Sequence, residues 1–156
     1  MIRIDFELNA QPATLECPAQ RRLLSLLRED LGLIGAKPGC DIGRCGACMV
    51  WLDGQPVNAC LVMAWQLHGR RVTTVEAIAA DPESAPVRDA LARCGAVQCG
   101  YCNPGMLVTM TYLHLRQPRP QAREAVQLMC GNLCRCTGYG GVSRAIDELF
   151  GALDVP

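Results

Sequence analysis

The chain has 156 residues, and 15 Lys plus Arg balance 15 Asp plus Glu, so its formal net charge at pH 7 is zero. A neutral chain without a basic tail argues against a dedicated nucleic-acid binder, which needs clustered cations. Half of the residues are apolar, which excludes intrinsic disorder, and no run of 18 apolar residues is present to span a membrane. The eleven cysteines are an odd number, so they cannot all pair as disulfides within the chain.

The first half of the chain has the pattern of a small mixed α/β unit. Apolar and charged residues alternate over 2–8, which predicts a half-buried strand, and residues 13–17 can pair back onto it. Residues 21–31 are predicted to form a helix that ends before Gly32, and one face of it carries Leu23, Leu24, Leu27 and Leu31. Further along, the sequence predicts a hairpin over 49–58, turning at Asp53-Gly54, and a strand over 71–73.

The N-terminal region has no pattern of a secretory signal. Residues 1–8 alternate instead of starting basic and then running apolar. Arg21-Arg22 is followed by leucines, as in a twin-arginine signal, but Arg28, Glu29 and Asp30 end the apolar run. We therefore interpret this stretch as an amphipathic helix and expect a cytoplasmic protein, in which clustered thiols more often bind metal than form cross-links.

The second half of the chain is predicted to be helical. Pro82 and Pro86 are expected to bracket a linker, and Pro104 suits the first position of a helix. The predicted helices cover 86–96, 104–115, 123–129 and 142–152. These patterns indicate an α+β fold with two domains, 1–75 and 76–156, each small enough for a metal to add needed stability.

Four cysteines in the first half have the spacing of an iron–sulfur site. Cys40, Cys45 and Cys48 follow a C-x4-C-x2-C pattern, and Cys60 supplies the fourth thiol, as in plant-type [2Fe–2S] ligation. Interleaved glycines allow the backbone N–H groups to approach the sulfurs. A zinc knuckle is the alternative, but zinc sites usually pair two short C-x2–4-C knuckles, and Cys60 stands alone.

A second set of four cysteines lies in the helical half. Cys99 and Cys102 precede the helix that starts at Pro104, and Cys134 and Cys136 lie between the third and fourth predicted helices. Two loops at one end of a bundle could bring these four thiols together. Spacing alone leaves three possibilities open: an iron–sulfur cluster, a zinc site, or a redox-active C-x2-C pair.

Three motifs in order carry a resemblance that covers nearly the whole chain. They are KPGCDIGRCGAC at 37–48, AVQCGYCNPGM at 96–106 and GNLCRCTGY at 131–139. With them, the chain resembles the small iron–sulfur subunit of the molybdenum hydroxylases, the xanthine oxidase and aldehyde oxidoreductase family. The resemblance implies a β-grasp, plant-type ferredoxin-like domain followed by a four-helix bundle, each with one [2Fe–2S] cluster.

The resemblance also implies a function. A large partner subunit carries the molybdopterin cofactor and the catalytic glutamate, so no catalytic residue is expected in this chain. Electrons pass from that centre to the helical-domain cluster (Cys99, Cys102, Cys134, Cys136), and from there to the ferredoxin cluster (Cys40, Cys45, Cys48, Cys60). The final acceptor is FAD on a further subunit or an external acceptor. Gln98 and Cys136 are the positions expected to lie against the partner's pterin.

The remaining candidate residues have simpler interpretations. Three cysteines are left over and are expected to pack in the core as thiols, and neither histidine has a second ligand at metal-site spacing. Both tryptophans are expected in the core or at an interface. These residues are Cys17, Cys94 and Cys130, His68 and His114, and Trp51 and Trp65. Two other functions remain to be weighed: a stand-alone two-cluster ferredoxin and a zinc-stapled interaction module.

Overall fold

A five-stranded sheet forms the first half of the molecule in the computed structural model, which describes residues 1–152. The strands are β1 (Ile2–Leu8), β2 (Gln11–Cys17), β3 (Met49–Leu52), β4 (Gln55–Asn58) and β5 (Arg71–Thr73), and their order in the sheet is β2-β1-β5-β3-β4. β5 runs parallel to β1, whereas the other neighbours are antiparallel. The short strand β5 therefore joins two hairpins into one sheet.

The N-terminal hairpin confirms the strand pair that was predicted from the alternation of apolar and charged residues. Ile4 pairs with Leu15 and Phe6 with Ala13 across the β1–β2 ladder. Asn9 and Ala10, with φ of 51° and 63°, form the two-residue turn, as the handedness of such hairpins requires. β2 begins at Gln11, two residues before the predicted start, because the turn is this short.

The predicted helix over 21–31 is only partly confirmed. The structure has one α-helical turn, α1 (Leu23–Ser25), followed by a wider π-helical segment, η1 (Leu26–Asp30). Leu31 N–H donates to the Leu26 carbonyl at 3.1 Å, five residues back. The predicted face is buried at Leu23, Leu24 and Leu27, which are 5% exposed or less, but Leu31 is only partly buried. Leu26, which was not placed on that face, is fully buried as well.

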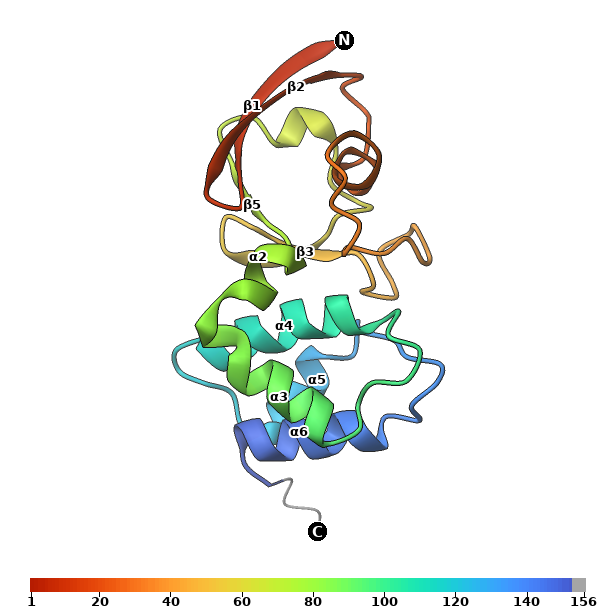
Figure 1. The fold of residues 1–156 in the computed structure, drawn as a ribbon, viewed down its shortest axis with the longest axis vertical. Coiled ribbons are helices and arrows are strands. Elements are labelled where there is room, and N and C mark those ends of the chain that lie inside the picture. Colours follow the sequence, from red (N-terminus) through yellow and green to blue (C-terminus); the bar gives the residue numbers. More distant parts are fainter. Residues whose placement is uncertain (153–156) are drawn as a thin grey trace.

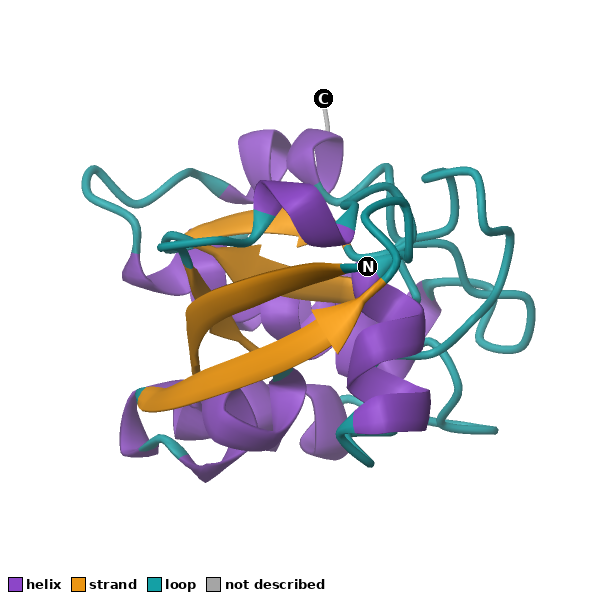
Figure 2. Cartoon of the chain, turned by 90° about the horizontal axis from the view of Figure 1, so that it is seen from above, coloured by secondary structure: helices purple, strands orange, loops and turns teal. Residues whose placement is uncertain are grey.

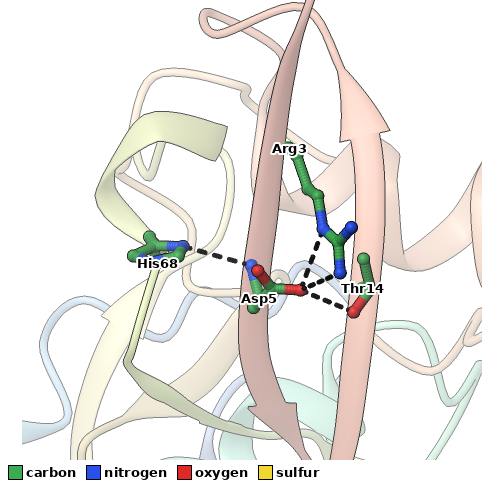
Figure 3. A network of polar contacts seen from close by, with 4 residues as sticks. All are labelled: Arg3, Asp5, Thr14 and His68. Atoms are coloured by element: carbon green, nitrogen blue, oxygen red, sulfur yellow. Dashed lines mark hydrogen bonds and ion pairs between the residues drawn. The ribbon is translucent and has the colours of Figure 1, made fainter.

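A network of polar contacts links β1 to β2 and to the loop that contains His68 (Figure 3). The Asp5 carboxylate accepts from the Thr14 hydroxyl at 2.7 Å, while the Asp5 backbone N–H donates to Nδ1 of His68 at 3.2 Å. The Thr14 bond, with Arg3 nearby, lowers the pKa of Asp5. His68 therefore serves as an acceptor for β1, in the loop after the short 3₁₀ turn η2 (Ala64–Gln66).

The second half is helical, with α2 (Val75–Ala80), the 3₁₀ turn η3 (Pro82–Ser84), α3 (Ala85–Arg93), α4 (Asn103–Leu115), α5 (Ala122–Leu128) and α6 (Gly140–Phe150). The predicted linker at Pro82–Pro86 is wrong, because η3 leads directly into α3. α2 was missed because its six residues are too short to show a helical period. Figure 1 shows the helices stacked below the sheet, with the N-terminus and α6 at opposite ends of the long axis.

The two halves have separate cores that meet along β3 and α4. Val50 and Leu52 of β3 are buried in the sheet core, whereas Met49 and Trp51 pack against the helical core. Indole Nε1 of Trp51 donates to the Val108 carbonyl of α4 at 3.1 Å. α4 is buried almost throughout, from Gly105 to Thr111, because the sheet covers one side and the other helices cover the rest.

Candidate metal centres

Three loops lie on the same side of the molecule and contain all the candidate ligands but one. In Figure 1 they are the orange loop after η1, the green loop after α3 and the blue loop after α5. Figure 2, seen from above, shows the long loops gathered on this side. The first loop carries Cys40, Cys45 and Cys48, and Cys60, the exception, follows β4. The second carries Cys99 and Cys102, and the third Cys134 and Cys136.

Cys40 and Cys45 form one close pair in the first set. The backbone N–H groups of Arg44 and Cys45 donate to Sγ of Cys40 at 3.2 and 3.3 Å, and Cys40 N–H donates to Sγ of Cys45 at 3.4 Å. The backbone N–H groups of Ile42 and Arg44 lower the pKa of Cys40 to about 6. The loop thus favours the thiolate, which is the form that binds metal.

Cys48 and Cys60 form the second pair of this set, at its buried side. They are 3% and 1% exposed. Burial raises the pKa of the Cys48 thiol to about 12, and its Sγ lies 3.7 Å from Oδ1 of Asn58. Without a metal the Cys48 thiol holds its proton, so metal binding here is coupled to proton release.

The glycines of the first loop leave no room for side chains. A Cβ on Gly39 would lie 2.7 Å from Sγ of Cys45, and one on Gly43, where φ is +75°, would lie 2.3 Å from Cδ1 of Leu61. The backbone therefore wraps the sulfurs as closely as glycine permits. Amide groups around electron-rich sulfur are the surroundings that an iron–sulfur cluster requires.

The second set also divides into two pairs. Sγ of Cys136 lies 3.5 Å from Sγ of Cys99, and the thiols of Cys102 and Cys134 share a hydrogen bond. Burial raises the pKa of Cys102 to about 12. Cys99 and Cys136 are exposed, so this set lies nearer the surface than the first. The redox-disulfide interpretation of Cys99 and Cys102 loses support, since each thiol has its neighbour on the other loop.

Two polar residues, Thr137 and Tyr139, are hydrogen-bonded to Cys134. Neither was predicted individually from the sequence. The backbone N–H and the hydroxyl of Thr137 donate to its Sγ at 3.4 and 3.2 Å. Burial alone would raise the pKa of Cys134, but the Thr137 donors outweigh it, and the pKa falls to about 7. The phenol oxygen of Tyr139 accepts from Cys134 N–H at 2.9 Å. A polar side chain three residues after a ligand was the available signal.

The pairing of thiols fits a two-iron cluster better than one zinc ion. In residues 1–152, no three Cys, His, Asp or Glu side chains converge on one point as a single ion requires. Each set instead presents two thiol pairs, and in a [2Fe–2S] cluster each iron takes two of the four cysteines. The residues present therefore fit two such clusters.

The two sets are joined through backbone contacts. Leu133 N–H, next to Cys134, donates to the carbonyl of Cys45 at 2.9 Å. The Tyr101 hydroxyl, next to Cys102, donates to the Pro38 carbonyl at 2.7 Å. Both donors thus flank ligands of the second set, and both acceptors lie in the loop of the first set.

The other predicted residues have mixed outcomes. Gln98 is exposed beside Cys99, and Cys17 is buried in the sheet core as expected. Core packing is only partly right for Cys94, which also lies 3.5 Å from Oε2 of Glu148, and it is wrong for the exposed Cys130. Trp51 lies at the interface of the two halves, but Trp65 is 61% exposed.

Comparisons with known proteins agree with this geometry. Residues 6–66 match a 2Fe-2S iron-sulfur cluster binding domain, and residues 74–147 match a [2Fe-2S] binding domain. The small FeS subunit of nicotinate dehydrogenase from Eubacterium barkeri is 41% identical over 145 residues, covering 93% of this chain and 92% of that protein.

Solved structures show the same fold in two settings. Quinoline 2-oxidoreductase from Pseudomonas putida 86 matches with a TM-score of 0.83 and 38% identity, over 93% of this chain and 90% of the matched chain. Aldehyde oxidoreductase from Desulfovibrio gigas matches with a TM-score of 0.85 and 33% identity, over 96% of this chain but 17% of that one. The fold thus occurs both as a separate chain and as part of a longer polypeptide.

Proposed function

The chain belongs to the small iron–sulfur subunits of the molybdenum hydroxylases, and from this premise we propose which residues perform each part of its function. It is the electron-transfer subunit of an oxidoreductase complex, with two [2Fe–2S] clusters of its own and molybdopterin on a partner subunit. The clusters supply one-electron transfer; the chain supplies the thiolates, the amide donors and the insulation from water.

The ligands of the ferredoxin cluster are Cys40, Cys45, Cys48 and Cys60, and those of the helical-domain cluster are Cys99, Cys102, Cys134 and Cys136. The arrangement of each set as two thiol pairs is the observation that carries this assignment. The N–H groups around Cys40 and the Thr137 donors on Cys134 stabilise negative charge on sulfur. They therefore raise the reduction potential of the cluster beside them.

The domain division follows the two cores. We propose a β-grasp domain over 1–75 and a four-helix bundle over 76–156 built from α3, α4, α5 and α6, with residues 153–156 lying outside the described residues. The contacts of α6 with α3 and α5, and of α4 with α3, support this arrangement. The helical core includes Val75, so the domain boundary falls close to the start of α2.

The surface positions suggest the direction of electron flow. Gln98 and Cys136 are exposed on adjoining loops of the helical half, and we place them against the pterin of the large subunit. The ferredoxin cluster then delivers electrons to FAD on a further subunit or to an external acceptor. We expect assembly in the cytoplasm, where the eight ligand thiols stay reduced. In residues 1–152, no helix is long and apolar enough to cross a membrane.

Iron analysis and EPR test the assignment. Anaerobically purified protein should contain about four irons per chain and show two distinct reduced [2Fe–2S] signals. The substitution Cys99→Ser should remove one signal and block electron exit from molybdenum, while substrate binding to the large subunit survives. Cys130→Ser is the matched control and should keep both signals.

The outcomes separate the competing functions. Zinc in place of iron would favour the interaction module and overturn the proposal. Two clusters in a chain that never associates with a pterin-bearing subunit would favour the stand-alone ferredoxin, which the relatives support less. If turnover with the natural acceptor survived Cys99→Ser, the proposed electron route would be wrong.

A further inference from the structure

A ring of hydrogen bonds joins Cys134 to Thr137 and Tyr139, which follow it in the chain. Cys134 N–H donates to the phenol oxygen of Tyr139 at 2.9 Å, and Tyr139 N–H donates to Oγ1 of Thr137 at 3.2 Å. The Thr137 hydroxyl donates to Sγ of Cys134, also at 3.2 Å, and this bond closes the ring. We call these three residues the Cys134 clasp.

The clasp fixes the direction in which the Thr137 hydroxyl points. A hydroxyl group has one hydrogen to donate and two lone pairs that accept. Because the Tyr139 N–H can only donate, the Thr137 oxygen accepts from it, and the Thr137 hydrogen is left for Sγ of Cys134. The backbone N–H of Thr137 donates to the same sulfur at 3.4 Å. The sulfur therefore has two donors from one residue, and Tyr139 holds the hydroxyl in its donating orientation.

Tyr139 has an unfavourable backbone conformation in this arrangement. Its φ and ψ are 65° and −4°, in the left-handed region, and Gly138 before it has a φ of 59°. A bulky residue is rare in this region, and such a conformation persists only where the surrounding contacts compensate for its cost. Besides its two bonds in the clasp, Tyr139 accepts from Ser143 N–H at 2.8 Å through its carbonyl. The clasp is thereby anchored to the first turn of α6.

Donors to a ligand sulfur act on the reduction potential of the cluster that it binds. One-electron reduction adds one negative charge, which the ligand sulfurs share, and no bond to the protein forms or breaks. A hydroxyl interacts more strongly with sulfur when the sulfur is more negative, so it stabilises the reduced form more than the oxidised form. Cys134 and Thr137 are both partly buried, which reduces the screening of this bond by water.

We propose that Tyr139 is a positioning residue for the Thr137 hydroxyl, and that the Cys134 clasp holds the reduction potential of the helical-domain cluster above the value that four cysteines alone would give. The electron comes from the molybdopterin subunit and leaves to the ferredoxin cluster, so the clasp makes the first of these transfers more favourable. The proposal rests on the proposed function, because it takes Cys134 to be a cluster ligand. It goes beyond that function by assigning a role to Tyr139, whose side chain does not bond to the sulfur.

The test removes hydroxyl groups one at a time. Thr137→Val deletes the donor but keeps the branched shape and the backbone N–H, whereas Thr137→Ser keeps a hydroxyl. Tyr139→Phe deletes the phenol oxygen that holds Cys134 N–H. Thr111→Val is the matched control, because the Thr111 hydroxyl is buried in α4, at 1% exposure, and has no hydrogen-bond partner among the described residues. These variants, and the double variant at 137 and 139, are purified as the complex and titrated anaerobically with dithionite while EPR follows each cluster. The signal that Cys99→Ser removes identifies the helical-domain cluster.

We expect Thr137→Val to lower the ratio of reduced to oxidised helical-domain cluster about tenfold at a fixed solution potential, which is about 59 mV for a one-electron couple. Thr137→Ser should restore a ratio within about threefold of wild type. Tyr139→Phe should lower the ratio less than Thr137→Val does, and it should add nothing further in the Thr137→Val background, because it acts through the hydroxyl. The ferredoxin cluster, and both clusters of Thr111→Val, should keep their wild-type potentials.

Unchanged potentials in Thr137→Val, or equal shifts of both clusters, would overturn the clasp and leave the proposed function intact. A Tyr139→Phe shift that adds fully to the shift of Thr137→Val would show that Tyr139 does not act through the hydroxyl. If Thr137→Val assembles no helical-domain cluster, Tyr139→Phe decides the matter, since an unchanged potential in that variant overturns the proposal. Wild-type protein without two reducible iron clusters would instead refute the proposed function, and the clasp with it.

Discussion

The backbones of the two halves approach each other closely at Gly105, in the first turn of α4. A Cβ at this position would be 2.0 Å from the carbonyl oxygen of Gly46 and 3.2 Å from Cα of Ala47. Both obstacles are backbone atoms, so no side-chain rotation can relieve the clash. Gly46 lies between the candidate ligands Cys45 and Cys48, so Gly105→Ala should push α4 away from the ferredoxin cluster loop.

The magnitude comes from two opposed effects. Alanine is better than glycine within a helix by about 1 kcal/mol. Overpacking typically costs about 1–3 kcal/mol, and a backbone clash that no rotamer relieves belongs at the upper end, about 3 kcal/mol. The net destabilisation should be about 2 kcal/mol, which for a chain of this size lowers the apparent Tm by about 4–8 °C.

Thermal unfolding, with iron content and EPR, measures the effect of this substitution. Gly140→Ala is the control, because Gly140 also starts a helix, has no positive φ and would place its Cβ at an ordinary 3.7 Å from Arg144. We expect the control to melt at or slightly above the wild-type temperature, and Gly105→Ala to lose stability and part of the ferredoxin signal. An unchanged Tm with full iron in Gly105→Ala would refute the reasoning that this contact sets the spacing of the two halves.

Three further predictions concern other parts of the molecule. Trp51→Phe removes the 3.1 Å bond to the Val108 carbonyl and should cost about 1 kcal/mol in a denaturant titration, with both EPR signals kept. Burial, with Arg119 nearby, lowers the pKa of His114 below 6.5, so the unfolded chain binds that proton more readily and stability falls as the pH drops through this range. As the pH is lowered from about 7.5 to about 5.5, the Tm of His114→Gln should therefore fall less than the Tm of wild type. An equal fall in Tm in both proteins would contradict this. Tyr101→Phe removes the bond to Pro38, but at an exposed side chain, so iron content should stay complete and Tm should change less than in Trp51→Phe.

Elements with a strong local pattern were predictable from the sequence. The alternation of residues 2–8 and the Asp53-Gly54 turn specify their strands and hairpin, because burial on one face leaves a period of two. α2 and the π-helical segment η1 were not predictable. α2 is six residues long, and η1 depends on how the leucine face packs under the sheet, which is a tertiary effect.

Cysteine spacing is a local signal, so the sequence alone identifies the first set as an iron–sulfur candidate, whereas the second set also needed the resemblance of its flanking motifs; the structure brings Cys99 and Cys136 of that set together across 37 residues of sequence. Which thiols pair within each set and the Thr137 donors on Cys134 were not accessible in this way. They depend on how separate loops dock against each other, and no residue pattern along one segment records that.

The position of β5 has a consequence for how the protein is made. β5 lies between β1 and β3, yet it is the last strand of the sheet to be synthesised, directly before α2. The two hairpins form locally, but they join into one sheet only when residues 71–73 have left the ribosome. During synthesis the loop with Cys40, Cys45 and Cys48 therefore leaves the ribosome before the sheet beside it can close, so the Cys48 thiol, which is 3% exposed in the finished fold, is still accessible at that stage.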